Sequence, residues 1–226
     1  MRLNADFTKR AVVHAASVPW IASPMKGVER RMLDRIGDEV ARATSIVRYA
    51  PGSHFSAHNH DGGEEFLVLE GTFQDEHGDY PAGTYVRNPP GTSHTPGAED
   101  GCTILVKLWQ FDPDDRNQFS RDSTAMDWIA SASQPGVEKI QLHTDARETV
   151  RMERWASGTT INHEPEGGAE ILVLEGSFQE SDEAFSTWSW LRLPPGAPLR
   201  AVAGPEGCKV WVKEGHLADI QQSPLS

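Results

Sequence analysis

The sequence predicts an all-β protein made of two tandem jelly-roll-type barrels that arose by internal duplication. Two observations lead to this fold class. Short runs of β-branched and aromatic residues alternate with turns that contain Gly, Pro or Asp. The second half of the chain also repeats the first, so the same set of strands occurs twice. Many short strands of this kind indicate a sandwich or a jelly roll.

The duplication is visible in four pairs of similar segments. The members of each pair lie about a hundred residues apart, which is the size of one small β domain. The pairs are WIASPMKGVER (20–30) with WIASASQPGVEK (128–139), EEFLVLEGTFQDE (64–76) with AEILVLEGSFQES (169–181), RNPPGTSH (87–94) with RLPPGAPL (192–199), and GCTILVK (101–107) with GCKVWVK (207–213).

The repeats set the expected domain boundaries. We expect a first unit over residues 14–111 and a second, degenerate unit over residues 125–216. The polar stretch DPDDRNQFSRDST, 112–124, is typical of a linker. Residues 1–13 then form an N-terminal arm and residues 217–226 a C-terminal tail.

The strands of the first unit follow in order along the chain. The segment VERRMLDRIGDEVARA, 28–43, has the mixed charges of a helix, but its duplicate at 137–152 is a poorer helix. We therefore expect strand, turn and strand in both copies. The runs TSIVRYA, EFLVLEGTF, TYVRN and CTILVKLWQF are the next strands, and the turns PGS, DGG, EHGDYPAG and PPG separate them.

Composition excludes several classes of function. The formal net charge of −12 would repel DNA, RNA and anionic lipid, so we expect neither a nucleic-acid nor a membrane partner. No run of 18 apolar residues occurs, and the N-terminus lacks the apolar core of a signal peptide. Two cysteines do not make a disulfide framework. A cytoplasmic protein is the expectation.

Titratable side chains gather where strands begin in the first unit. Because side chains alternate across a strand, His58 and His60 share one face and converge if that face looks into the barrel. Glu64 begins the next strand after the DGG turn. The segment PPGTSH then brings His94 to the start of a further strand.

These four residues together predict a metal site. Each of them alone is more often a solvated or hydrogen-bonded residue than a ligand. However, three histidines and a carboxylate are costly to bury without a cation, and imidazole and carboxylate groups hold divalent first-row metals. We therefore predict that His58, His60, Glu64 and His94 bind one divalent metal ion.

Three further residues are candidates for the surroundings of this site. His54 lies on the same strand face as the paired histidines, where it is either a pocket or supporting group or a solvent-facing strand end. Phe66 and Val68 share the face of Glu64 and are candidates for lining a pocket.

Two motifs in this region resemble those of the cupin superfamily. The first motif lies in residues 52–71 and the second in residues 83–94. They read Gly52-x5-His58-x-His60-x3-Glu64-x6-Gly71 and Gly83-x5-Pro89-x-Gly91-x2-His94. The resemblance implies a cupin barrel in which the four residues form the metal cage. The asparagine that often follows the second motif is replaced by Ala98, and it is not a ligand in that superfamily.

A narrower resemblance covers most of the chain. The segment PGSHFSAHNHDGGEEFLVLEGTFQDEHGDYPAGTYVRNPPGTSHTP, 51–96, is similar to the C-terminal cupin domain of ChrR-type anti-sigma factors, in which the matching residues bind zinc. The likeness extends to WIASPMKGVE upstream and GCTILVKLWQF downstream. That family carries a separate helical N-terminal domain that binds the sigma factor. It has no counterpart before residue 14, so a sigma factor is not an expected partner.

The second unit lacks most of these ligands. His58 corresponds to His163, whereas the other three positions hold Pro165, Ala169 and Leu199. The turns and the aliphatic strand are retained. We infer that the ligands were lost while the scaffold stayed, although drift at positions without a role would give the same pattern. One metal ion per chain is expected.

Two functions of different class remain. The resemblance favours a regulatory or sensing metal-binding protein that holds zinc. The alternative is a mononuclear non-haem dioxygenase with Fe, Mn or Ni, acting on a small organic substrate such as a diketone or a phenol. A small-molecule ligand would then occupy the first barrel. We also expect a homodimer or a strand exchange, with residues 1–13 as the exchanged arm.

Overall fold

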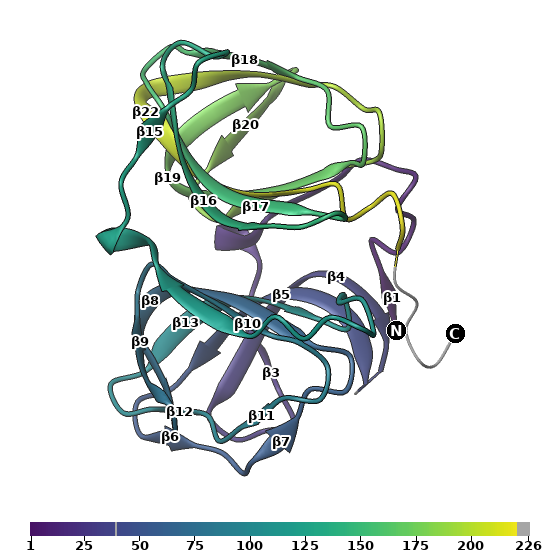
Figure 1. Cartoon of the computed structure of the whole chain (residues 1–226), viewed down its shortest axis with the longest axis vertical. Coiled ribbons are helices and arrows are strands. Elements are labelled where there is room, and N and C mark those ends of the chain that lie inside the picture. The colour runs from purple at the N-terminus through teal and green to yellow at the C-terminus, as the bar shows by residue number, and fades with distance from the viewer. Residues whose placement is uncertain (39, 221–226) are drawn as a thin grey trace. The chain divides into compact units, whose positions relative to one another are not determined.

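The chain folds into strands joined by turns, which confirms the predicted all-β class (Figure 1). The computed structural model describes residues 1–38 and 40–220. Within this range the helical residues form two short 3-10 turns, η1 (Ala15–Ser17) and η2 (Ser123–Ala125). No helix in that part of the chain is long and apolar enough to cross a membrane.

Two compact units divide the described residues. Unit 1 comprises residues 1–5 and 19–125, and unit 2 comprises residues 6–18 and 126–220. The predicted boundaries differ from this division. The predicted linker contains a strand and η2, the predicted arm contributes to both units, and the part of the predicted tail beyond residue 220 lies outside the described residues.

Unit 1 is built around one antiparallel sheet in the order β1-β4-β5-β13-β8-β10-β14. A separate two-stranded sheet pairs β7 with β11. The predicted strand–turn–strand at 28–43 is present as β4 and the start of β5. The strands of unit 1 are β1 (Arg2–Leu3), β3 (Ile21–Ala22), β4 (Val28–Gly37), β5 (Ala41–Tyr49), β6 (Ser53–His54), β7 (His58–Asn59), β8 (Glu64–Asp75), β9 (Gly78–Pro81), β10 (Thr84–Asn88), β11 (Ser93–His94), β12 (Gly97–Ala98), β13 (Cys102–Leu108) and β14 (Phe119–Asp122).

Unit 2 repeats this architecture. Its sheet has the order β15-β16-β17-β22-β19-β21-β2. The strands are β2 (Ala11–His14), β15 (Ile129–Ala130), β16 (Val137–Thr144), β17 (Thr149–Trp155), β18 (Thr160–His163), β19 (Ala169–Glu180), β20 (Glu183–Ser186), β21 (Ser189–Leu193) and β22 (Leu199–Glu214).

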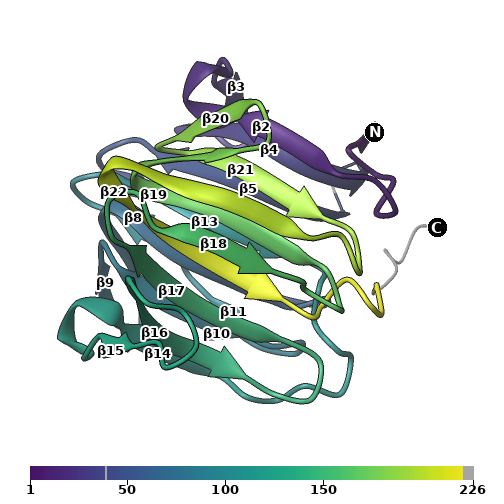
Figure 2. The same ribbon diagram turned by 90° about the horizontal axis from the view of Figure 1, so that it is seen from above.

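One strand of each repeat is exchanged between the units. The strand β2 precedes the first repeat in the chain, yet it pairs with β21 of unit 2 (Figure 2). Its counterpart β14 precedes the second repeat and pairs with β10 of unit 1. The two strands correspond in the duplication, as Trp20 corresponds to Trp128. A strand exchange between units or subunits was expected for residues 1–13; in the structure residues 6–18 belong to unit 2, whereas residues 1–5 stay with unit 1.

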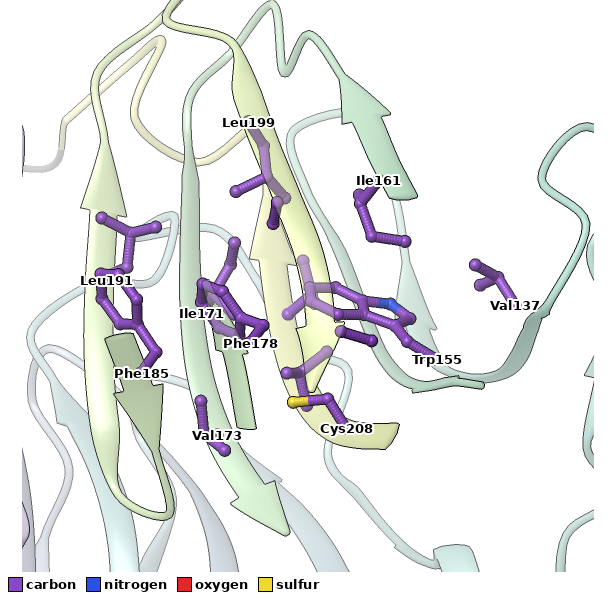
Figure 3. Packing of buried hydrophobic residues seen from close by; sticks show 14 of the residues in the cluster. Val137, Trp155, Ile161, Ile171, Val173, Phe178, Phe185, Leu191, Leu199 and Cys208 are labelled. Carbon is purple, nitrogen blue, oxygen red and sulfur yellow. The ribbon is translucent and has the colours of Figure 1, made fainter. Parts of the chain in front are cut away.

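The core of each unit lies between the inward faces of its strands. In unit 1, Phe66, Phe73 and Ile104 are buried together with aliphatic residues from neighbouring strands. In unit 2, an equivalent cluster contains Phe178 from β19 and Trp155 from β17 (Figure 3). Burial of one such side chain stabilises the folded unit by roughly 1.5–3 kcal/mol. Because each unit has a buried cluster of its own, each has its own hydrophobic core.

Candidate metal centre

The structure brings the four predicted ligands of unit 1 together. His58, His60, Glu64 and His94 each offer one ligand atom, and these atoms all lie within 4.8 Å of one another. We call this group the His–Glu cluster. His58 on β7 stands opposite His94 on β11 in the antiparallel ladder. The imidazole rings of His60 and His94 have centroids 4.5 Å apart.

A glycine turn places Glu64 next to the histidines. Gly63 has a φ of 76°, a left-handed conformation that favours glycine. A side chain at Gly62 would collide with the ring of Trp109, since its Cβ would lie 2.1 Å from that ring. The chain can therefore reverse tightly between His60 and the first residue of β8. This explains why the two glycines separate the ligand pair from the glutamate.

Thr92 fixes the proton position on His60. The Nδ1 atom of His60 lies 2.9 Å from Thr92 Oγ1. The hydroxyl of Thr92 donates its own proton to the carbonyl oxygen of Pro89, 2.8 Å away. Since that proton is committed, Thr92 Oγ1 accepts from Nδ1–H of His60. Nε2 of His60 therefore carries a lone pair directed at Glu64.

Asp75 has a similar relation to His94. The Nδ1 atom of His94 lies 3.3 Å from Asp75 Oδ2, and its Nε2 atom lies 3.5 Å from Glu64 Oε2. The ring also packs against Phe73, at a centroid distance of 5.6 Å. A carboxylate behind an imidazole orients the ring and makes the opposite nitrogen a better ligand.

Three members of the cluster, His60, Glu64 and His94, are buried, and the cluster lacks enough donors of its own. His60 Nε2 and Glu64 Oε2 lie 3.4 Å apart, and neither has a hydrogen-bond partner among the described residues. Lone pairs of two imidazoles and a carboxylate thus face one point. Leaving such groups unsatisfied in a buried site costs free energy. A cation at that point would satisfy them, so the residues present fit a metal ion.

The protonation preferences differ between the two buried histidines. Burial lowers the pKa of His60, because the charged imidazolium loses its hydration. Burial acts in the same direction on His94, but the contact with Asp75 and the charge of Glu64 outweigh it and raise the pKa of that imidazole. Burial also opposes ionisation of Asp75, yet its contact with His94 lowers the pKa of the carboxyl. Asp75 is therefore charged near neutral pH.

The three other predicted residues lie apart from the ligand atoms. His54 has a side chain 71% exposed and faces Glu99 at 3.5 Å, which matches its alternative as a solvent-facing strand end. Phe66 and Val68 are buried in the apolar core of unit 1. The residues that do contact the cluster, Thr92, Asp75 and Phe73, were not predicted. The only available signal was that Thr92 is replaced by Ala197 in the second repeat.

Unit 2 has no equivalent cluster at the corresponding positions. Ala169 and Leu199 are buried among apolar residues, and Figure 3 shows Leu199 near Ile161 in the core. The retained His163 places Nε2 2.6 Å from Glu214 Oε1. Its imidazole is thus engaged with a carboxylate from β22.

A second group of possible ligands occurs elsewhere in unit 2. His143, Asp145 and Glu148 offer atoms within 4.8 Å of one another. However, Glu148 already pairs with the buried ammonium of Lys213 at 2.9 Å. Asp145 accepts hydrogen bonds from His143 and from the backbone N–H groups of Arg147 and Glu148. The ionisable side chains of this group are already paired with protein groups, so they do not need a metal ion to satisfy them.

Comparison with known families gives two matches in this chain. Residues 8–112 and residues 116–218 each match a family model described as the ChrR cupin-like domain. Both matched segments begin before the exchanged strands β2 and β14. No curated protein sequence matches the chain.

Solved structures share the fold at low sequence identity. A provisionally named dioxygenase from Nostoc punctiforme has a TM-score of 0.75 and 14% identity, over 96% of this chain and 88% of that one. A cupin 2 conserved barrel protein from Leptotrichia buccalis has a TM-score of 0.57 and 12% sequence identity, over 86% of this chain and 92% of that one. A variant of oxalate decarboxylase from Bacillus subtilis has a TM-score of 0.61 and 13% sequence identity, over 91% of this chain and 77% of that one. These likenesses establish the fold.

Proposed function

Because this chain belongs to the family of ChrR cupin-like domains, we propose that it binds one divalent metal ion at the His–Glu cluster and acts as a regulatory or sensing protein. The ligands are His58, His60, Glu64 and His94. Unit 2, with three of the four positions replaced, serves as a metal-free partner domain.

The spacing of the acceptor atoms carries this proposal. Glu64 Oε2 lies 3.4 Å from His60 Nε2 and 3.5 Å from His94 Nε2. Three imidazoles and one carboxylate close to one another form a ligand set that would fill the four positions of a structural zinc ion.

The residues of the chain divide the work at this site. Thr92 and Asp75 hold the far nitrogens of His60 and His94, so that both rings are oriented before the metal arrives. His58 is exposed, so the cluster is reached from solvent on its side. A bound zinc ion would supply a structural link between β7, β8 and β11, and its loss would loosen that link.

The exposure of His58 also favours one alternative, a mononuclear non-haem dioxygenase. An Fe, Mn or Ni ion at the same ligands would keep two positions open for a small organic substrate and dioxygen. In that case Glu64 would act as a base as well as a ligand. The fold is shared with a provisionally named dioxygenase, which is compatible with this alternative but does not favour it over the regulatory one.

The first test is elemental analysis of protein purified without added metal. About one equivalent of zinc per chain supports the regulatory proposal. Iron or manganese, together with oxygen consumption in the presence of diketones or phenols, supports the dioxygenase alternative. Protein that binds none of these metals when they are added would refute both.

The Glu64→Gln variant separates the two functions. In a zinc protein the variant should lose metal and melt at a lower temperature, because binding to the folded state is stabilising. In a dioxygenase it should keep the metal and lose turnover. Glu70→Gln is the matched control, since Glu70 is exposed on the same strand β8. Metal loss in the variant, with no activity in either protein, would sink the dioxygenase alternative.

We propose a homodimer as the form in solution. Both sheets have edge strands, such as β3 and β15, whose residues are exposed. Light scattering gives the mass directly, and a monomer at micromolar concentration would refute the dimer. We propose no sigma factor, nucleic acid or membrane as partner.

A further inference from the structure

The lost metal site of unit 2 encloses a small cavity that contains charged residues. His163, Pro165, Ala169 and Leu199, which correspond to the four ligands of unit 1, all line it. The same cavity is lined by Arg151 and Glu153, both of which are buried. The charged groups therefore lie where the first repeat carries its His–Glu cluster.

Arg151 is the centre of an ionic network in this cavity. Its Nε atom donates to Glu153 Oε1 at 2.6 Å, and its Nη1 atom donates to Glu214 Oε2 at 2.8 Å. The other oxygen of Glu214 accepts from Nε2 of His163 at 2.6 Å. Trp155 donates its indole N–H to Glu153 at 2.7 Å. Three strands, β17, β18 and β22, are linked through one guanidinium.

The first repeat cannot form this network. Trp155 of β17 pairs with Cys208, as Tyr49 of β5 pairs with Cys102. Counting back along these strands, and along their partners β13 and β22, gives the counterparts of the charged residues. Arg151 corresponds to Ser45, Glu153 to Val47 and Glu214 to Leu108. Each repeat thus carries one arrangement and lacks the other.

The charges of the network stabilise one another. Burial lowers the tendency of Arg151 to be charged, but Glu153 and Glu214 outweigh this effect and raise its pKa. Burial also opposes ionisation of Glu214, yet the hydrogen bond from His163 and the charge of Arg151 lower the pKa of its carboxyl to about 2. The network therefore contains a permanent cation between two carboxylates.

We propose that the guanidinium of Arg151 takes, in unit 2, the place that the metal ion takes in unit 1. It joins the strands around the cavity, makes this unit independent of metal, and excludes a metal ion from the second site. The analogy between Arg151 and a metal ion in unit 1 rests on the proposed function of the His–Glu cluster. The role of Arg151 in joining the strands of unit 2 does not depend on that function.

The first test is thermal unfolding of the full chain with Arg151→Met. Removing one partner of a buried ionic network should lower the Tm of the chain by roughly 6–20 °C, because Glu153 and Glu214 lose their shared guanidinium. Glu153 then keeps only Lys139 and the indole of Trp155, and Glu214 keeps only His163. The shift should be the same in chelator-treated and metal-supplied protein, and the metal content should stay at the wild-type value. Arg151→Lys keeps the charge and should recover part of the shift. An unchanged Tm, or loss of metal from the first site, would overturn the proposal.

The second test transplants the ligands into unit 2. The variant Pro165→His, Ala169→Glu, Leu199→His should bind no additional metal while Arg151 remains. Adding Arg151→Ser, Glu153→Val and Glu214→Leu, the residues of the first repeat, should raise the metal content by one equivalent. An extra equivalent in the three-residue variant contradicts metal exclusion by Arg151, and so does a folded six-residue variant with no gain.

The two tests separate this proposal from the function of unit 1. Wild-type protein that binds no metal refutes the proposed function, while the thermal result for Arg151 still decides the inference. If the six-residue variant does not fold, the melting temperatures of the two single Arg151 variants decide it.

Discussion

Replacing Thr92 by valine tests how the protein prepares His60 for a metal ion. Valine keeps the shape of threonine but removes the oxygen that accepts from His60 Nδ1 at 2.9 Å. The N–H then lacks a partner in a buried site, or the proton moves to Nε2, where it blocks the metal. Supporting contacts of this kind are worth about 10–100-fold in metal affinity, or about 1.4–2.7 kcal/mol. That range agrees with the roughly 1–3 kcal/mol cost of an unsatisfied buried group.

The assay is a competition titration against a chromophoric chelator at constant pH. We expect the dissociation constant of Thr92→Val to rise about 10–100-fold, and that of Thr92→Ser, which keeps the hydroxyl, to stay within about threefold. Circular dichroism of both variants checks that the fold is retained. Equal affinities of the serine and valine variants would refute the reasoning, because the hydroxyl would then have no role in orienting His60.

Three further predictions follow from the differences between the repeats. Elemental analysis should show that His94→Ala loses most of the metal while His163→Ala keeps it; equal loss in both would place metal in both units. Val12→Pro should increase hydrogen exchange in β21 without loss of metal, because β2 pairs with that strand of unit 2. The matched Ser120→Pro should weaken metal retention, since β14 pairs with β10 of unit 1. The reverse result would contradict the exchange of strands between the units. The carboxyl of Glu214 has a folded pKa of about 2 against an ordinary 4.5, so its stabilisation is complete above pH 4.5 and is lost as the pH falls towards 2. Glu214→Gln should flatten this loss, about 3 kcal/mol at most, in denaturant unfolding between pH 2 and 5; an unchanged pH profile would contradict it.

Local patterns in the sequence were sufficient for the fold class and for part of the His–Glu cluster. The turn of fixed length that brings Glu64 beside His60 acts over a few residues, so it can be read without knowing the sheet order. The strand alternation expected for His58 and His60 is not present, because β7 ends at Asn59. His94 joins the cluster through the pairing of β11 with β7. The repeat supplied the second barrel in the same way, because one chain displays the pattern twice.

The tertiary structure alone decided the contacts between distant segments. The pairing of β2 with β21 joins residues far apart in the chain, and nothing in AVVH at 11–14 indicates its partner. Asp75 approaches His94 because of sheet register and not because of spacing in the sequence. Arg151 likewise looks like an ordinary strand residue in the sequence. Its ion pair with Glu214 forms only because β22 pairs with β17. A strand specifies which faces its side chains occupy, whereas the identity of its neighbours depends on how the whole sheet assembles.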